Sequence, residues 1–147
     1  RILPVDVFGD SSSTTTFDIA DGISQAVKNG ARLINLSLAS DSDSLLLRTV
    51  IGNSASQGVV FFAAAGNTPT TAPSFPAAYP EVTAVTAVEK NGSLASYANR
   101  GAFVAQLQRA LNGYLALPKS RRLRTDGTLG AGTVCAISEA EAASWLA

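Results

Sequence analysis

The feature that most constrains this fold is an unbroken apolar run that ends in small residues, Val59-Val60-Phe61-Phe62-Ala63-Ala64-Ala65-Gly66, followed by Asn67. In its first half no polar residue separates the large side chains, which is typical of a strand buried on both faces of a parallel sheet. Its second half shrinks to alanine and glycine, so that another chain or a ligand can approach the backbone. Because ligands of open α/β sheets bind outside the carboxyl ends of strands, Asn67 is a candidate site residue with a side-chain N–H to donate.

Apolar positions before and after this run alternate between strand and helix spacing. The pattern predicts strands at 2–8, 33–38 and 82–88, helices at 17–29 and 44–57, and a hairpin at Asn91-Gly92 with a return strand at 94–97. Thr15 or Thr16 can cap the first helix, and Gly30 follows its end. Residues 41–43 offer N-caps for the second helix, whose expected apolar positions are Leu46, Leu47, Val50, Ile51 and Ala55.

The order of these elements predicts the architecture. Each connection between strands is long enough for a right-handed crossover, which makes the sheet parallel. We therefore expect a three-layer α/β domain over residues 1–103, with helices on both faces of the sheet. Residues 104–147 are expected to form a small helical module, which closes with a capping box at Ser138 and Glu141 and a final alanine-rich helix.

Several short segments resemble, in family order, those of the subtilisin-like serine proteases (subtilases): Ile2-Leu3-Pro4-Val5, Asp18-Ile19-Ala20-Asp21-Gly22-Ile23, Asn29-Gly30-Ala31, Ile34-Asn35-Leu36-Ser37-Leu38, Val59 to Asn67 and Phe75-Pro76-Ala77-Ala78-Tyr79. The resemblance implies part of a subtilisin fold, an extended peptide or protein substrate, and an extracytoplasmic or secreted location. It also implies an oxyanion-hole role for Asn67, whose side-chain N–H would stabilise the tetrahedral intermediate. By the same resemblance the substrate strand lies on Ser37, Leu38 and Ala39, and one wall of the specificity pocket is formed by Ala64, Ala65 and Gly66.

The catalytic triad of that family has no counterpart in this sequence. The Asp and His motifs of the family precede the segment matched at Ile2, and the chain contains no histidine. The Ser motif should follow Phe103, but Gly127-Thr128-Leu129 places leucine where the nucleophile belongs. Two hypotheses follow. The chain is a segment of a secreted serine endopeptidase that is inert alone, or it is a non-catalytic interaction protein that binds peptides or bacterial cell wall.

The last part of the chain carries a second resemblance. Leu107-Gln108, Leu111-Asn112, Asp126-Gly127, Leu129-Gly130, Thr133 and Ala136 are spaced as in the helical peptidoglycan-binding modules of bacterial wall enzymes. The resemblance implies peptidoglycan as a partner of residues 104–147. A helix-loop-helix that uses the same residues for turn geometry is the alternative.

Composition excludes two classes of partner. The chain has 11 Lys+Arg and 11 Asp+Glu, and the one basic cluster lacks interleaved aromatic residues, so no nucleic acid is expected. No apolar run approaches the length of a transmembrane helix, so no membrane association is expected either. We expect no metal. We also expect no cofactor, and the sequence contains no dinucleotide-binding fingerprint after a strand.

Overall fold

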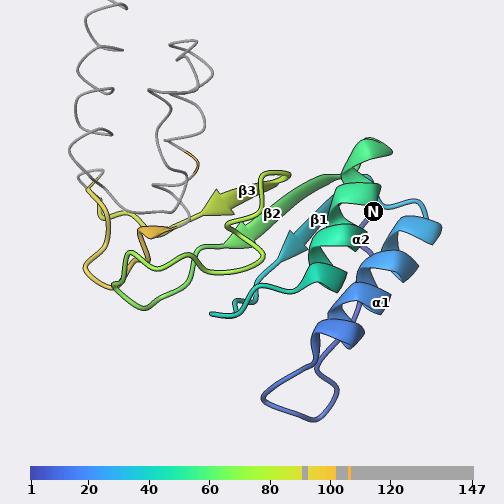
Figure 1. Cartoon of the computed structure of the whole chain (residues 1–147), viewed down its shortest axis with the longest axis horizontal. Helices are drawn as coiled ribbons and strands as arrows, with labels where there is room; N and C mark the ends of the chain where they lie inside the picture. The colour runs from blue at the N-terminus through green and yellow to red at the C-terminus, as the bar shows by residue number, and fades with distance from the viewer. Residues whose placement is uncertain (91–92, 102–105, 107–147) are drawn as a thin grey trace, which may run out of the picture.

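The computed structural model describes residues 1–90, 93–101 and 106, and in this part a small parallel sheet carries two helices (Figure 1). Its elements, in chain order, are α1 (Thr16–Lys28), β1 (Leu33–Leu36), α2 (Leu45–Ser56), β2 (Val60–Ala64) and β3 (Val82–Val85). The strands lie in the order β1-β2-β3, and both pairs are parallel. The predicted parallel α/β arrangement is therefore confirmed.

Capping residues determine where both helices begin and end. The Thr15 hydroxyl accepts a hydrogen bond from the Asp18 backbone N–H at 3.1 Å, as an N-cap should. Gly30 follows the end of α1 with a φ of +86°, a conformation that costs glycine little. For α2 the prediction was wrong by one position: the cap is Ser44, whose hydroxyl accepts from the Leu47 N–H, and not a residue of 41–43.

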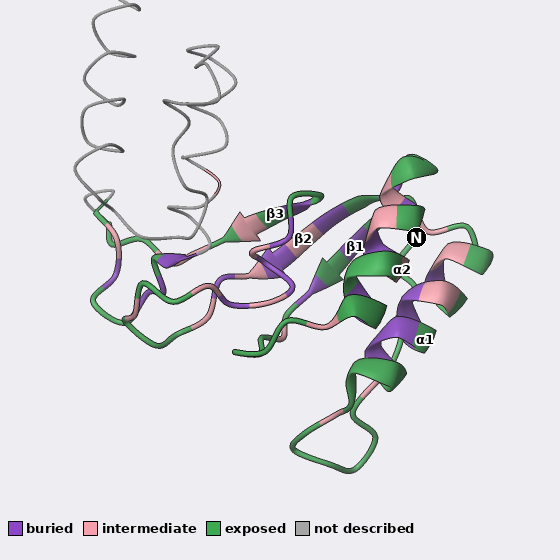
Figure 2. Ribbon diagram, in the orientation of Figure 1, coloured by how far each residue is buried: buried purple, intermediate pink, exposed green. Residues whose placement is uncertain are grey.

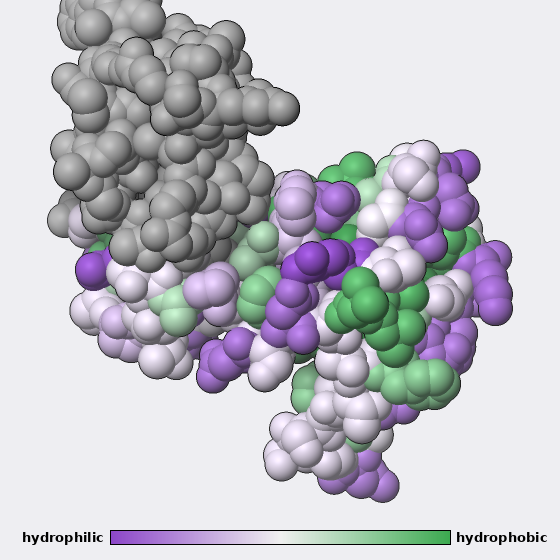
Figure 3. Space-filling model, viewed as in Figure 1, coloured by the Kyte–Doolittle hydropathy of each residue, from purple (hydrophilic) through white to green (hydrophobic). Residues whose placement is uncertain are grey.

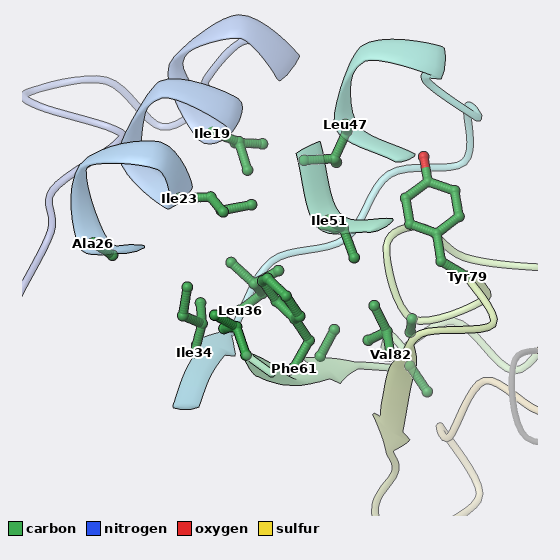
Figure 4. Close-up of a cluster of buried hydrophobic side chains, with 14 residues drawn as sticks. Ile19, Ile23, Ala26, Ile34, Leu36, Leu47, Ile51, Phe61, Tyr79 and Val82 are labelled. Atoms are coloured by element: carbon green, nitrogen blue, oxygen red, sulfur yellow. The ribbon is translucent and has the colours of Figure 1, made fainter. Parts of the chain in front are cut away.

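The core lies between the two helices and one face of the sheet (Figure 4). The helices contribute Ile19, Ile23 and Ala26 of α1 with Leu47 and Ile51 of α2; the strands contribute Ile34, Leu36, Phe61, Ala63 and Val82. Most apolar positions predicted for the helices are buried or half-buried, but Leu46 is 44% exposed. Figure 3 shows apolar surface over the first turn of α2, where Leu45 and Leu46 are exposed.

Among the described residues no helix covers the opposite face of the sheet, which we call the open face. Burial alternates along β1 and β2, so that only every second residue faces the helices (Figure 2). Leu33 is 61% exposed, Val60 49% and Val85 52%. Both described helices pack on the same face, and the described residues therefore form two layers.

Two further predictions need correction. The strand predicted at 2–8 is not formed, and no described strand pairs with these residues. Beyond β3, the predicted hairpin is reduced to one antiparallel bridge between Val88 and Leu94, supported by a 2.7 Å hydrogen bond from the Glu89 N–H to the Ser93 carbonyl. Residues 91–92 and, apart from Gln106, the predicted tail module lie outside the described residues.

Candidate functional site

The predicted site residues lie at one edge of the sheet, where β1 and β2 both end. Leu36 pairs with Ala63 in the parallel register, so Ser37–Ala39 and Ala64–Gly66 leave the sheet side by side. Ser37 and Ala39 are exposed and Leu38 is half-buried; Ala65 is fully buried, and Ala64 and Gly66 are half-buried. The structure thus brings together the two groups of residues that the sequence assigned to substrate binding.

The segment after β1 is held by two kinds of hydrogen bond. The Asn35 side-chain amide donates to the Ser37 hydroxyl at 2.9 Å. Ser40 forms an antiparallel bridge with Phe75, with N–H···O distances of 2.8 Å in both directions. The segment is therefore held at Ser37 through its side chain and at Ser40 through its backbone.

Asn67 stands at the end of the same edge, and its side chain is exposed. The preceding Gly66 has a φ of +100°, a conformation that residues with a side chain rarely adopt. The Gly66 carbonyl accepts a hydrogen bond from the Asn99 N–H at 3.1 Å, and the Ala65 N–H donates to the Val85 carbonyl at 2.8 Å. These contacts fix the backbone that carries Asn67 and leave its amide facing solvent.

The loop at 99–101, which the sequence did not identify as part of the site, contacts this turn. Asn99 is 3% exposed, and its side-chain oxygen accepts from the Gly101 N–H at 2.7 Å. The Arg100 N–H donates to the Thr70 carbonyl at 2.9 Å. A Cβ on Gly101 would lie 2.1 Å from the Ala72 carbonyl oxygen, so only glycine allows this approach. No signal in the single sequence identifies Asn99 as a buried polar residue.

The ionisable groups with shifted pKa values lie away from this edge. Backbone N–H donors from Phe8 and Gly9 lower the pKa of Asp6, whose carboxylate closes a turn. Burial raises the pKa of Tyr79, whose hydroxyl contacts Asp43 and Ser44.

Within residues 1–90, 93–101 and 106 no group of three metal-ligating side chains is found, and no helix there is long and apolar enough to cross a membrane.

Comparison with known proteins identifies the fold and its family. The sequence profile of the Subtilase family matches residues 1–139. The chain belongs to the subtilases. Among curated subtilases it is 35% identical to Subtilisin Savinase of Lederbergia lenta over 128 residues, 87% of this chain and 48% of that protein. It is 40% identical to the Thermophilic serine proteinase of Bacillus sp. (strain AK1) over 104 residues, 71% of this chain and 26% of that protein.

Solved subtilase structures agree. The self-cleaved protease domain of PatA superposes with a TM-score of 0.63 at 30% identity, covering 71% of this chain and 40% of that one. The Prenylagaramide maturation protease PagA gives a TM-score of 0.61 at 31% identity, covering 70% of this chain and 38% of the protease. The chain thus spans half or less of each of these subtilases, and its fold is part of the subtilisin α/β fold.

The subtilase profile extends past residue 103, where the sequence predicted a boundary between two domains. Residues 107–147 lie outside the described part of the chain, so both the boundary and the peptidoglycan-binding resemblance stay predictions. Gln106, at the end of the described chain, donates from its side-chain amide to the Val82 carbonyl at 2.6 Å. It therefore contacts the outer edge of β3.

Proposed function

We propose that this chain forms the substrate-binding and oxyanion side of a subtilisin-like serine endopeptidase and does not hydrolyse peptides by itself. The observation that carries the proposal is the adjacency of Ser37–Ala39 and Ala64–Asn67 at the carboxyl ends of β1 and β2. The subtilase match adds the chemistry, since relatives of this chain are named as proteases. An extracytoplasmic location is part of the proposal and comes from the same family.

The position of residues 37–40, directly after β1 and bridged at Ser40, suits recognition of a peptide by strand addition. Main-chain hydrogen bonds would supply affinity, and the small residues Ala64–Gly66 leave room for one substrate side chain beside them. Asn67 would contribute little to the binding of the uncleaved substrate. Its N–H would instead act on the charge that develops on the carbonyl oxygen during attack, which in a working enzyme contributes about 3–4 kcal/mol.

The chain alone lacks the group that would start the reaction. A serine hydroxyl is a poor nucleophile until a base removes its proton, and histidine, the base in this family, does not occur in the sequence. A lone oxyanion donor without an attacking group leaves the barrier to hydrolysis in place. The proposal therefore separates binding, which the chain performs, from catalysis, which it does not.

A titration with an unreactive extended peptide tests the binding half. We expect backbone amide shifts at 37–40 and 64–66, with an affinity that is flat between about pH 6 and 8 because the sequence has no histidine, the side chain whose ordinary pKa lies in that range. Asn67→Ala should leave the peptide affinity within about twofold, as should the control Asn53→Ala on the exposed face of α2. Shifts confined to residues 107–147 would refute this placement.

A further inference from the structure

Residues 40–44 connect the proposed substrate-binding residues Ser37–Ala39 to α2, and the segment 75–79 contacts both ends of this connection. At the first end the Ser40 N–H donates to the Phe75 carbonyl and the Phe75 N–H donates to the Ser40 carbonyl, both at 2.8 Å. Because Ser40 directly follows the proposed substrate-binding residues, this pair of bonds constrains where that stretch ends.

At the second end the contact is made by the hydroxyl of Tyr79, whose ring points toward the start of α2 (Figure 4). The hydroxyl accepts from the Ser44 N–H at 3.2 Å, and it lies 3.1 Å from each of two acceptors, an Asp43 carboxylate oxygen and the Ser44 carbonyl. Tyr79 is only 1% exposed. Because water is poorly placed to replace these bonds, removal of the hydroxyl should loosen residues 43–44 from the segment 75–79.

Side chains link the two ends. The Phe75 and Tyr79 rings pack with their centroids 5.2 Å apart. The Arg48 guanidinium lies over the Tyr79 ring, 5.5 Å from its centroid, and forms an ion pair with Asp43. Because both members of this pair are about half exposed, it contributes little to stability, but it keeps the Asp43 carboxylate beside the Tyr79 hydroxyl. Tyr79 thus lies at the centre of the contacts between 40–44 and 75–79.

We propose that Tyr79 is a positioning residue for peptide binding: its hydroxyl holds residues 40–44 against 75–79 and so keeps Ser37–Ala39 in the arrangement that receives a peptide. The inference rests on the proposed function, because it takes the peptide to lie beside Ser37–Ala39. Its physical basis is preorganisation, since a stretch that is already held in place loses less conformational entropy when it binds. Without the hydroxyl, binding would also have to order residues 40–44, which costs free energy.

The test compares peptide affinity in the full chain with and without the hydroxyl. In Tyr79→Phe the dissociation constant of the unreactive extended peptide should rise about fivefold, the effect of losing one net hydrogen bond. Thr49→Val is the matched control, because it removes a hydroxyl that bonds to the Leu45 carbonyl within α2; its dissociation constant should stay within about twofold of the native value. Circular dichroism checks that each chain is folded during the titration. In a folded chain, a purely structural role of Tyr79 would leave this constant unchanged.

A second pair of variants tests the Asp43 carboxylate as the partner of the hydroxyl. Asp43→Ala should weaken binding about threefold, and the double variant Asp43→Ala/Tyr79→Phe should bind about as weakly as Tyr79→Phe alone, because both changes break one connection. Asp43→Asn keeps an acceptor oxygen at this position and should restore most of the affinity.

The pH dependence of binding gives a further readout. Burial raises the pKa of Tyr79 above 10.0, so peptide affinity should fall only as the pH rises above that value and the hydroxyl loses the proton that it donates. Among the described residues the charged groups beside this hydroxyl are Asp43 and Arg48, and the Asp43 carboxylate would repel a phenolate. This part of the fall should be absent in Tyr79→Phe.

The titration distinguishes failure of the positioning role from failure of the proposed function. If the native chain shows no peptide-dependent amide shifts at 37–40, the proposed function fails and the positioning role falls with it. If the native chain binds the peptide there and folded Tyr79→Phe binds it equally well, the positioning role alone is overturned. A loss in Thr49→Val as large as that in Tyr79→Phe, or strictly additive effects of Asp43→Ala and Tyr79→Phe, would overturn it as well.

Discussion

The two faces of this sheet carry similar side chains and have different surroundings. Phe61 on the helix face is fully buried, whereas Val60 and Leu33 on the other face are about half exposed or more. β2 is continuously apolar in the sequence, and β1 is apolar apart from Asn35. An apolar run therefore shows that a strand is suited to burial on both sides, and the structure shows that only one side is covered within the described residues.

The difference teaches where the stability of this part of the chain resides. Apolar area that is removed from water contributes about 25 cal/mol per Å², and exposed apolar area contributes nothing. The helix face should therefore account for most of the free energy of unfolding. The open face should contribute little to that free energy, because Leu33, Val60 and Val85 keep about half or more of their surface in water.

The largest expected effect comes from Phe61→Ala set against Phe62→Ala. Removing the buried ring should lower the free energy of unfolding by about 3–5 kcal/mol, because it leaves a cavity in the core. Phe62 is only half-buried on the open face, and its truncation should cost about 1 kcal/mol. Urea unfolding followed by circular dichroism measures both. Equal losses would remove the distinction between the faces.

Tyr79→Phe tests the hydrogen bonds that the buried Tyr79 hydroxyl makes with Asp43 and Ser44. The Tyr79 side chain is 1% exposed; its hydroxyl donates to Asp43 and to the Ser44 carbonyl at 3.1 Å and accepts from the Ser44 N–H at 3.2 Å. Losing these bonds while keeping the ring should cost about 1–2 kcal/mol in free energy of unfolding. An unchanged urea midpoint in the variant would contradict the assigned role of the hydroxyl.

The same residue gives the stability a dependence on pH. Burial raises the pKa of Tyr79 above its ordinary value of 10.0 in the folded chain. The unfolded chain therefore loses this proton first as the pH rises, so stability should decline from about pH 10 upward. Tyr79→Phe should remove that part of the decline. Thermal unfolding of both proteins between pH 8 and 11 measures it, and parallel curves would contradict the assignment.

Thr15→Ala weakens α1, one of the two helices that cover the buried face of the sheet. Without the cap the first turn of α1 loses the partner of the Asp18 N–H, which should cost about 1 kcal/mol. Thr49→Ala on α2 is the matched control, because its hydroxyl bonds only to the Leu45 carbonyl within the helix. A loss for Thr49→Ala equal to that for Thr15→Ala would show that α1 is not held by its cap.

The smallest effect is expected on the open face. Val60→Thr changes a half-exposed position and should alter the free energy of unfolding by less than about 0.5 kcal/mol. It should also lower the fluorescence of a bound hydrophobic dye, since it makes the open face more polar. A loss above 2 kcal/mol would mean that this face is covered in solution.

Local signals in the sequence predicted much of the fold. Thr15 and Gly30 mark the ends of α1 through capping chemistry that involves only neighbouring residues, and the run from Val59 predicted β2. The open face and the unpaired stretch at 2–8 were not predictable, because both depend on contacts with residues distant in sequence. A strand-like pattern describes what a segment can do, and its partner decides whether it does so.

The candidate site was predictable to a similar extent. The small residues after β1 and β2 identified the edge, and the parallel register then placed the two groups together. Asn99 and Gly101 escaped notice because their importance lies in contacts with Gly66 and Ala72, which are about 30 residues away in the sequence. Nothing in their own neighbourhood indicates such contacts.

The most direct test of the account is whether the chain cleaves a peptide that is proposed to bind beside Ser37–Ala39 and Asn67. We propose measuring labelling by a fluorophosphonate probe together with turnover of a chromogenic peptide, with an intact subtilisin as the positive control. The account predicts no labelled serine and no turnover above the uncatalysed rate, while the amides of 37–40 still shift with an unreactive peptide. Stoichiometric labelling of a serine with turnover that Asn67→Ala lowers by about 10²–10³ would contradict it.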